Sequence, residues 1–357
     1  MDSFAQRVIA WHKQHGRKNL PWQQDINPYR VWVSEIMLQQ TQVTTVIPYF
    51  HKFMDSFPTV NKLAAASLDH VLHHWTGLGY YARARNLHRA ARMVVNDFHG
   101  EFPTDVDALT ELPGIGQSTA GAIVSIAGNK RGVILDGNVK RVLTRFHAVS
   151  GYPGKSEVAR QLWALADEHT PGEETGTYTQ AIMDLGATLC VRKRPACTDC
   201  PVHEDCRARA LGTPEQFPEP KPKREKPVRS ARFFVVTHLG NMVLLQQRPT
   251  DGLWGGLWTP PERATDTTVE DFLDELQLGP AARIHIAPDF RHTFTHFHLD
   301  IEPVYIELQN IPEMSVAEGG YQWIQFADMT ANNTTFGLSA PAVRLLGSLQ
   351  TLELSAT

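Results

Sequence analysis

Apolar residues recur at helical spacing through the first 212 residues, as in helices that bury one face. One helix is predicted to begin at Asn27-Pro28, because asparagine caps a helix start and proline fits the first turn. Ser67 predicts the cap of another helix, which stops at Gly77. Further helices are predicted over residues 80–99, 117–127, 156–168 and 175–189.

Beyond residue 231 the pattern changes to that of strands. The runs RFFVVTHL and MVLLQQRP flank Gly240-Asn241, which is typical of a β-hairpin turn. Further strands are predicted in HFHLDIEPVYIEL and YQWIQF, and helices over residues 269–276 and 340–349. We therefore expect an α+β domain over residues 231–350. Residues 213–230 are rich in Pro and Lys and predict an extended linker.

The stretch LPGIGQSTAGAI, followed after a spacer by ILDGNVKRV, carries the first candidate chemistry. Gly114 and Gly116 predict a tight turn before a helix, and the unpaired N–H groups of a helix start suit a phosphate. Asp136 follows in an apolar setting, with Lys140 one helical turn later. Two interpretations remain open from the pattern alone: chemistry beside a nucleic-acid backbone, or a helix hairpin with a capping aspartate.

Composition and charge restrict the class of protein. The 357 residues are 42% hydrophobic and 20% charged, with no apolar run of membrane-spanning length and no signal-peptide pattern, so we expect a cytoplasmic monomer that does not bind membranes. The net charge is −4, but it is uneven: residues 1–225 hold 26 Lys and Arg against 23 Asp and Glu, and residues 226–357 hold 8 against 15. Nucleic-acid binding would therefore need a local basic patch.

All four cysteines fall within a short segment: Cys190, Cys197, Cys200 and Cys206. Such clustering indicates one metal site in a reducing compartment rather than a set of disulfides. Four thiolates can hold either zinc or an iron–sulfur cluster. Zinc sites usually contain two Cys-x2-Cys pairs, and this segment contains one.

Together these motifs resemble the MutY family of adenine DNA glycosylases. The resemblance extends through PWQQDINPYRVWVSEIMLQQTQV and WTGLGYYARARNLH. It implies an all-α helix-hairpin-helix glycosylase over residues 1–212, followed by the linker and a Nudix-like α+β domain over residues 231–350. The helical part would comprise a six-helix module at about residues 20–130 and an iron–sulfur module of residues 1–19 and 131–212. The cysteine spacing matches the family's [4Fe–4S] loop.

The resemblance also implies two catalytic carboxylates. An acid among apolar neighbours, such as Glu35, is by itself either a helix-surface residue or a functional group. In the family this position protonates the adenine, and Asp136 stabilises the oxocarbenium-like sugar, with Asn138 close by. Related lyases carry a lysine where this chain has Ser118, so hydrolysis by water without strand cleavage is implied.

The remaining implied site residues contact DNA or the adenine. Gln40 and Tyr80 match positions that wedge into the duplex, and Trp22 and Gln180 match positions of the adenine pocket. The backbone contacts would come from Gly114, Gly116 and Lys140.

The C-terminal domain is implied to recognise the opposite base. RPTDGLWGGLWTPPE resembles the Nudix fold, but the catalytic Nudix box is missing. RHTFTHFHLD matches the loop that recognises 8-oxoguanine, with Phe294-Thr295-His296 where the family commonly has Phe-Ser-His. His292, His296 and His298 also permit a metal site, although such histidines are more often ordinary surface or core residues.

The implied function is monofunctional removal of adenine mispaired with 8-oxoguanine or guanine in double-stranded DNA. Three alternatives remain: a lyase of the endonuclease III type, a Nudix hydrolase, and a noncatalytic DNA-binding or electron-transfer protein. Ser118 argues against the first and the missing Nudix box against the second. In the third, Glu35 and Asp136 would be dispensable.

Overall fold

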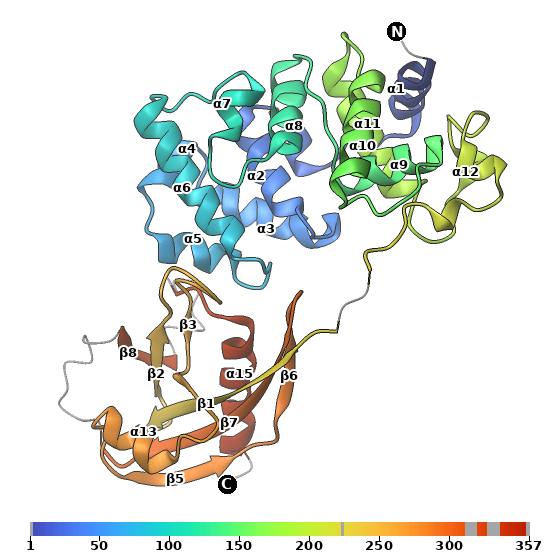
Figure 1. The fold of residues 1–357 in the computed structure, drawn as a ribbon. Coiled ribbons are helices and arrows are strands. Elements are labelled where there is room, and N and C mark those ends of the chain that lie inside the picture. Colours follow the sequence, from blue (N-terminus) through green and yellow to red (C-terminus); the bar gives the residue numbers. More distant parts are fainter. Residues whose placement is uncertain (1–2, 223–224, 311–319, 327–335, 355–357) are drawn as a thin grey trace. The chain divides into compact units, whose positions relative to one another are not determined.

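The computed structural model describes residues 3–222, 225–310, 320–326 and 336–354 (Figure 1). The chain divides into two compact units. The first joins Met1–Ala65 to Asn86–Lys223, and the second joins Ala66–Arg85 to Arg224–Thr357.

The first unit is helical, as the spacing of apolar residues predicts. Its principal helices are α1 (Ser3–His15), α2 (Pro28–Leu38), α3 (Val43–Ser56), α4 (Val60–Ala65), most of α6 (Ala82–Asp97), α7 (Val106–Thr110), α8 (Gln117–Gly128), α9 (Gly137–His147), α10 (Ser156–His169), α11 (Thr175–Thr188) and α12 (Arg207–Ala210). Short 3-10 turns are η1 (Pro21–Gln23), η2 (Cys197–Asp199) and η3 (Pro214–Gln216).

Two predicted helix starts are confirmed at atomic detail. The Asn27 side chain accepts a hydrogen bond from the backbone N–H of Arg30 at 3.0 Å, with Pro28 in the first turn of α2. Ser67 Oγ accepts one from the backbone N–H of His70 at 3.2 Å at the start of α5 (Leu68–Trp75), which belongs to the second unit. Each bond satisfies a donor that the helix leaves unpaired.

Small residues let α8 and α11 approach their neighbours closely in the first unit. A Cβ atom on Gly121 of α8 would lie 2.1 Å from the carbonyl oxygen of Val133. One on Gly176 of α11 would lie 2.7 Å from that of Ser125, and one on Gly186 would lie 2.6 Å from Asn138 Cβ. These contacts set the start of α9 against α8 and α11, and the core beneath is formed by apolar residues of α1, α9, α10 and α11.

The second unit contains a mixed sheet whose principal strand order is β3-β2-β1-β7-β5. Its strands are β1 (Val228–His238), β2 (Met242–Gln247), β3 (Trp258–Thr259), β4 (Glu262–Arg263), β5 (Ala281–Ile286), β6 (Phe290–Thr293), β7 (His298–Leu308) and β8 (Tyr321–Gln325). The strands β4, β6 and β8 pair with β1, β7 and β2, respectively. The predicted hairpin at Gly240-Asn241 is confirmed, since β1 and β2 pair antiparallel.

Two helices pack on the sheet of this unit. Helix α13 (Val269–Glu275) contributes Phe272, whose ring stacks on Phe234 of β1 with centroids 4.0 Å apart. Helix α15 (Ala340–Leu354) accepts a hydrogen bond at the Leu345 carbonyl from Tyr305 Oη of β7, at 3.2 Å. Val304 packs in the cluster around α13. Because consecutive residues of a strand point to opposite faces, the two helices cover opposite faces of the sheet.

Hydrogen bonds join the 66–85 segment to β2 and to the segment before α15 in the same unit. Gln247 Nε2 donates to Asp69 Oδ1 at 3.0 Å, and Tyr81 Oη donates to the Leu338 carbonyl at 3.1 Å. None of the helices in the described part of the chain is long and apolar enough to cross a membrane.

Candidate active site and its neighbouring loops

Helix α2 positions Glu35. Its apolar side chains, including Trp32, Ile36 and Met37, are buried. Glu35 lies among them in sequence but lines a cavity of about 620 Å³. This carboxyl therefore lies at a concave site rather than on an open helix surface.

Asp136 is held at the start of α9, where it acts as the helix cap. Its Oδ1 accepts a hydrogen bond from the backbone N–H of Val139 at 2.8 Å, and its Oδ2 accepts one from Asn138 Nδ2 at 3.3 Å. Ser118 Oγ accepts a hydrogen bond from the backbone N–H of Leu135 at 3.0 Å, which fixes the residue before Asp136. The capping role is therefore present, and it holds the carboxylate at the cavity.

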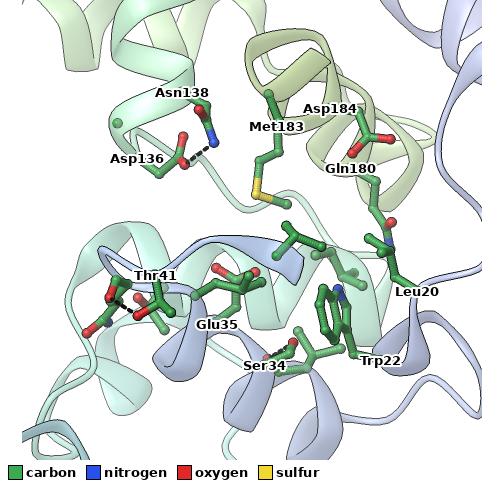
Figure 2. A pocket seen from close by; sticks show the side chains of 18 of the residues that line it. Leu20, Trp22, Ser34, Glu35, Thr41, Asp136, Asn138, Gln180, Met183 and Asp184 are labelled. Atoms are coloured by element: carbon green, nitrogen blue, oxygen red, sulfur yellow. Dashed lines mark hydrogen bonds between the residues drawn. The ribbon is translucent and has the colours of Figure 1, made fainter. Parts of the chain in front are cut away.

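The cavity brings together residues that are far apart in sequence (Figure 2). Glu35 lies on one wall, whereas Asp136 and Asn138 lie on the facing wall. Seven of the predicted site residues line it: Trp22, Glu35, Gln40, Ser118, Asp136, Asn138 and Gln180. Its volume is in the range of small-molecule sites, so one nucleobase with its sugar fits by size.

The two carboxyl groups differ in their surroundings. Burial, and then the neighbouring charge of Asp136, raise the pKa of Glu35 to about 8. Burial also raises the pKa of Asp136, but the hydrogen bonds from Val139 and Asn138 and the charge of Arg141 oppose the shift. Although burial raises both pKa values, only Asp136 has neighbours that oppose the shift, so the two acids are suited to opposite protonation states. Glu35 is mostly protonated at neutral pH.

Aromatic and amide side chains form another part of the wall. Trp22 is buried and meets the Phe50 ring edge-on, with centroids 5.6 Å apart. Gln180 Oε1 accepts a hydrogen bond from Gln23 Nε2. Such a combination of a flat apolar surface and oriented amides can hold a nucleobase by stacking and by hydrogen bonds.

The turn before α8 contains two glycines that differ in backbone conformation and in the space around them. Gly114 has φ +81°, and a Cβ atom there would lie 2.9 Å from Asn86 Cβ. Gly116 caps α8 with φ −92°, which any residue adopts, and apart from its neighbours in the chain no described residue comes within 4 Å of where a Cβ atom on it would lie. Lys140 is half-buried on α9 and is not among the cavity residues. The fold thus explains glycine at position 114 but leaves the space beside Gly116 open.

The predicted wedge residues occupy left-handed backbone positions. Gln40 has φ +57° and lies at the cavity, directly after α2. Tyr80 has φ +50°, follows Gly79 at φ +77°, and is 49% exposed in the second unit. The guanidinium of Arg83 lies 5.5 Å from the centre of its ring. An exposed aromatic ring held at a tight turn is available to stack on a base.

The four cysteines line a second, separate cavity in the first unit. None of them forms a disulfide. Buried Arg145 of α9 binds the segment that carries them, donating to Cys190 Sγ at 3.4 Å and to the Val191 carbonyl at 2.7 Å. Among the described residues, no three His, Cys, Asp or Glu side chains converge closely enough for a single metal ion.

Arg141 connects the cysteine segment to the wall of the active-site cavity. It donates to the Cys190 carbonyl at 2.7 Å and to Asn138 Oδ1 at 2.9 Å. Since Asn138 in turn donates to Asp136, a continuous set of hydrogen bonds runs along the first turns of α9.

In the second unit, a tight turn connects β6 to β7. The backbone N–H of Phe294 donates to the Phe297 carbonyl at 2.9 Å, and Thr295 and His296 are exposed at the tip. The predicted strand at residue 296 therefore begins later, at His298, because this turn comes first. His292, His296 and His298 lie on β6, the turn and β7, and no metal site forms among the described residues.

Comparison with known proteins decides the family. A model described as HhH-GPD superfamily base excision DNA repair protein matches residues 33–168, and a NUDIX domain model matches residues 232–346. The adenine DNA glycosylase of Buchnera aphidicola subsp. Acyrthosiphon pisum (strain APS) is 36% identical over 343 residues, covering 96% of this chain and 96% of that protein. The chain belongs to the adenine DNA glycosylase family.

Further comparisons agree with this family. The human adenine DNA glycosylase is 35% identical over 383 residues, covering 90% of this chain and 70% of that protein. The structure of a thermostable thymine-DNA glycosylase is 25% identical with a TM-score of 0.53, covering 58% of this chain and 95% of that chain. The expected fold class is confirmed: a helical N-terminal region followed by a mixed α+β Nudix-like domain.

Sequence reasoning missed several cavity residues of this family member. Met183 reaches into the space near Glu35, and Asp184 lies beside it on α11 (Figure 2). Asp184 accepts hydrogen bonds from the backbone N–H and the Nε–H of Arg17 at 2.8 and 2.9 Å. Their spacing in the sequence could have indicated them, because both follow Gln180 by about one helical turn and therefore lie on the same face of the helix.

Proposed function

We propose that this family member hydrolyses the N-glycosidic bond of adenine mispaired with 8-oxoguanine or guanine in double-stranded DNA. The observation that carries the proposal is the pair Glu35 and Asp136, which line one cavity with the pKa of Glu35 raised to about 8. Adenine is a poor leaving group until a ring nitrogen is protonated. An acid that keeps its proton at neutral pH, beside a hydrogen-bonded carboxylate, suits that requirement.

The proposed reaction uses the two carboxyl groups in different ways. Glu35 donates its proton to N7 of the extruded adenine, so that the base leaves as a neutral molecule. The sugar develops positive charge, which ionised Asp136 stabilises, and water then attacks the anomeric carbon and gives up a proton, which restores the acid form of Glu35. Asn138 orients Asp136 through the hydrogen bond to its Oδ2. Trp22 and Gln180 hold the adenine by stacking and by hydrogen bonding.

We further propose that strand cleavage does not accompany base removal. A lyase needs an amine to attack the sugar carbon. Ser118 is a cavity residue, but its hydroxyl accepts a hydrogen bond from the Leu135 backbone and is no amine. This contact supports a positioning role for Ser118, because it holds the segment that precedes Asp136.

The cysteine segment is proposed to hold a [4Fe–4S] cluster through Cys190, Cys197, Cys200 and Cys206. Tetrahedral zinc requires four ligand atoms at about 2.3 Å from one point. The four thiols line one cavity, and their spacing contains one Cys-x2-Cys pair rather than the two that are usual for zinc. The cluster would have a structural role, because Arg145 and Arg141 donate hydrogen bonds to Cys190 and so bind the segment after α11.

The proposed DNA contacts follow from exposure and backbone geometry. Gly116 leaves open space at the start of α8, where N–H groups can approach a phosphate, and Gly114 makes the turn that precedes it. Lys140 would add a charge contact to the backbone. Gln40 and Tyr80 would fill the gap left by the extruded base.

The domain organisation is proposed to separate catalysis from recognition. Residues 1–212 would carry the chemistry, in modules of about 20–130 and of 1–19 with 131–212. Residues 213–230 would be the linker, and 231–350 the reader of the opposite base. Phe294, Thr295 and His296 would contact 8-oxoguanine, and the exposed tip of the β6–β7 turn supports this.

The decisive experiment offers the purified full chain a duplex that contains adenine opposite 8-oxoguanine. We expect free adenine and an abasic site in an intact strand, detected by chromatography and by gel analysis before and after alkali. Duplexes with adenine opposite thymine and with cytosine opposite 8-oxoguanine serve as controls. Strand nicking without alkali would contradict the monofunctional proposal, and no adenine release would contradict the activity itself.

A further inference from the structure

The reader turn is supported by an aromatic cluster beyond its own residues. Phe294 stacks on buried Phe297 with ring centroids 4.5 Å apart and an interplanar angle of 17°. The guanidinium of Arg229, on β1, lies 4.8 Å from the centre of the Phe297 ring. Lys226 Nζ donates to the Phe294 carbonyl at 2.8 Å. The turn therefore has a defined inner side, while Thr295 and His296 face outward.

Trp254 joins this cluster from a separate loop. Its ring centroid lies 5.3 Å from that of Phe294 and 5.8 Å from that of His292. It also meets Phe233 edge-on at 6.3 Å. Trp254 is 7% exposed, so its surface is used within the protein rather than offered to a ligand. Aromatic pairs at such distances add about 0.5–1.5 kcal/mol each beyond the area they bury.

The loop that carries Trp254 is itself closely fixed. The backbone N–H of Arg248 donates to the Leu257 carbonyl at 2.9 Å, and that of Leu257 donates to the Trp254 carbonyl at 2.9 Å. A Cβ atom on Gly255 would lie 2.1 Å from the Thr250 carbonyl oxygen. Trp254 has φ +54°, a conformation that bulky residues rarely adopt. The surrounding loop holds Trp254 in this unfavourable backbone conformation, and it thereby fixes where the indole ring lies.

We propose that Trp254 is a positioning residue for recognition of the base opposite adenine: it supports the Phe294 ring and so sets the orientation of Thr295 and His296. This inference rests on the proposed reader function of the β6–β7 turn. Trp254 acts through Phe294 and does not touch the base. Without the indole, Phe294 loses the ring partner that the separate loop supplies while Phe297 remains, so the turn persists but its tip is less well ordered.

The test replaces Trp254 in the full chain and measures discrimination. Trp254→Leu keeps an apolar side chain but removes the ring, and Trp254→Phe restores an aromatic ring. Trp258→Leu is the matched control, since Trp258 is also 7% exposed but pairs with Phe336 instead. Two ratios are measured. The first is the single-turnover rate with adenine opposite 8-oxoguanine divided by the rate with adenine opposite guanine. The second is the dissociation constant of the product duplex that contains guanine divided by that of the product duplex that contains 8-oxoguanine.

We expect Trp254→Leu to lower both ratios at least about fivefold, an effect of the size of one aromatic pair. The rate opposite guanine should stay within about twofold, because the carboxylates lie in the other unit. Trp254→Phe should recover most of the discrimination, and the control should retain it. Melting curves verify that each variant is folded. If Trp254→Leu does not fold, Trp254→Phe is used for the test, and a smaller fall in both ratios is expected for it.

Two outcomes separate this inference from the proposed function beneath it. If Thr295→Ala with His296→Ala lowers the ratios but neither Trp254 variant does, the turn is the reader and Trp254 does not position it. If none of these variants changes the ratios, the reader proposal itself fails. Equal losses in the Trp254→Leu and Trp258→Leu variants would also overturn the inference, because general loosening of the domain would then explain them.

Discussion

Two carboxyl groups at one cavity acquire different properties from their immediate contacts. The neighbours of Glu35 on α2 are apolar, so burial dominates and keeps it protonated. Asp136 receives hydrogen bonds from Val139 and Asn138, which favour its ionised form. The family resemblance implied a protonated Glu35 and an ionised Asp136, but the sequence did not indicate the hydrogen bonds and charges around each acid. Pairwise pKa effects depend on contacts between helices, which no local pattern contains.

Glu35→Gln keeps the size of the side chain and removes the acidic proton. We expect adenine release to fall by at least about 100-fold, the usual size of a lost general acid, with duplex binding nearly unchanged. Single-turnover kinetics and a gel-shift titration measure the two quantities. Glu101→Gln, at an exposed position of the same unit, is the control and should behave like the parent. Activity of Glu35→Gln within a few fold of the parent would show that another group supplies the proton.

The raised pKa of Glu35 also predicts the pH profile of the reaction. The acid is active in its protonated form, so the contribution of Glu35 to the rate is maintained below the folded-state pKa of about 8 and is lost as the pH rises through it. Well above that value, the rate should fall about tenfold per pH unit. Glu35→Gln should show no corresponding fall in its residual rate. A parent rate that stays constant to about pH 10 would contradict the assignment.

At the scale of helices and loops, capping and turn residues made the sequence informative. Asn27 and Ser67 begin helices where predicted, and Gly114 makes its turn. The helix predicted over residues 117–127 does end at Gly128, but the close contact between Gly121 of the same helix and Val133 appears only in the structure.

Gly121→Ala should therefore destabilise the protein, whereas Gly128→Ala should not. The new Cβ at position 121 would lie 2.1 Å from the Val133 carbonyl oxygen, and such overpacking costs about 1–3 kcal/mol. The same substitution at Gly128 meets only the flexible Lys130 side chain at 3.9 Å, so at this helix end it should stabilise by at most the roughly 0.5–1 kcal/mol that alanine gains over glycine inside a helix. Denaturant titration measures both. Equal effects at the two positions would refute this account of α8 packing.

The cysteine segment leads to a prediction about the iron and sulfide content of the purified protein. Protein purified without oxygen should contain about four iron and four sulfide per chain and absorb broadly in the visible range. Cys200→Ser should lower the iron content, and Ser156→Ala on α10 serves as a control outside the segment. Colorimetric iron and sulfide assays decide the matter. Stoichiometric zinc without sulfide would contradict the cluster.

At the scale of the whole molecule, the order of domains could be predicted from the sequence, but the long-range pairing could not. β1 and β7 run parallel over residues 228–238 and 298–308, a pairing between segments 70 residues apart that no local periodicity specifies. The cavity likewise gathers residues from η1, α2, α8, α9 and α11. The grouping of residues 66–85 with the C-terminal strands depends on contacts such as that between Asp69 and Gln247. The composition of the chain predicts a domain boundary near the linker, but it does not predict such long-range contacts.

The division into two units leads to the last prediction, which concerns the choice of adenine. Adenine is a normal base, so the information that marks it for removal must come from its partner. Both carboxylates lie in the first unit, whereas the exposed turn with Thr295 and His296 lies in the second. Removing both side chains should therefore affect the choice of substrate more than the chemistry.

In the full chain, Thr295→Ala with His296→Ala should lower the preference for 8-oxoguanine over guanine at least about tenfold, since each polar contact to a base is worth about 1–3 kcal/mol of discrimination. Adenine release opposite guanine should change by less than about twofold. His285→Ala, at an exposed histidine on β5 of the same domain, is the matched control and should retain the preference. Single-turnover rates on the two duplexes provide the comparison. If the double variant discriminates as the parent does, the C-terminal domain does not recognise the opposite base through this turn, and its exposed surface is better explained as a binding site for another partner.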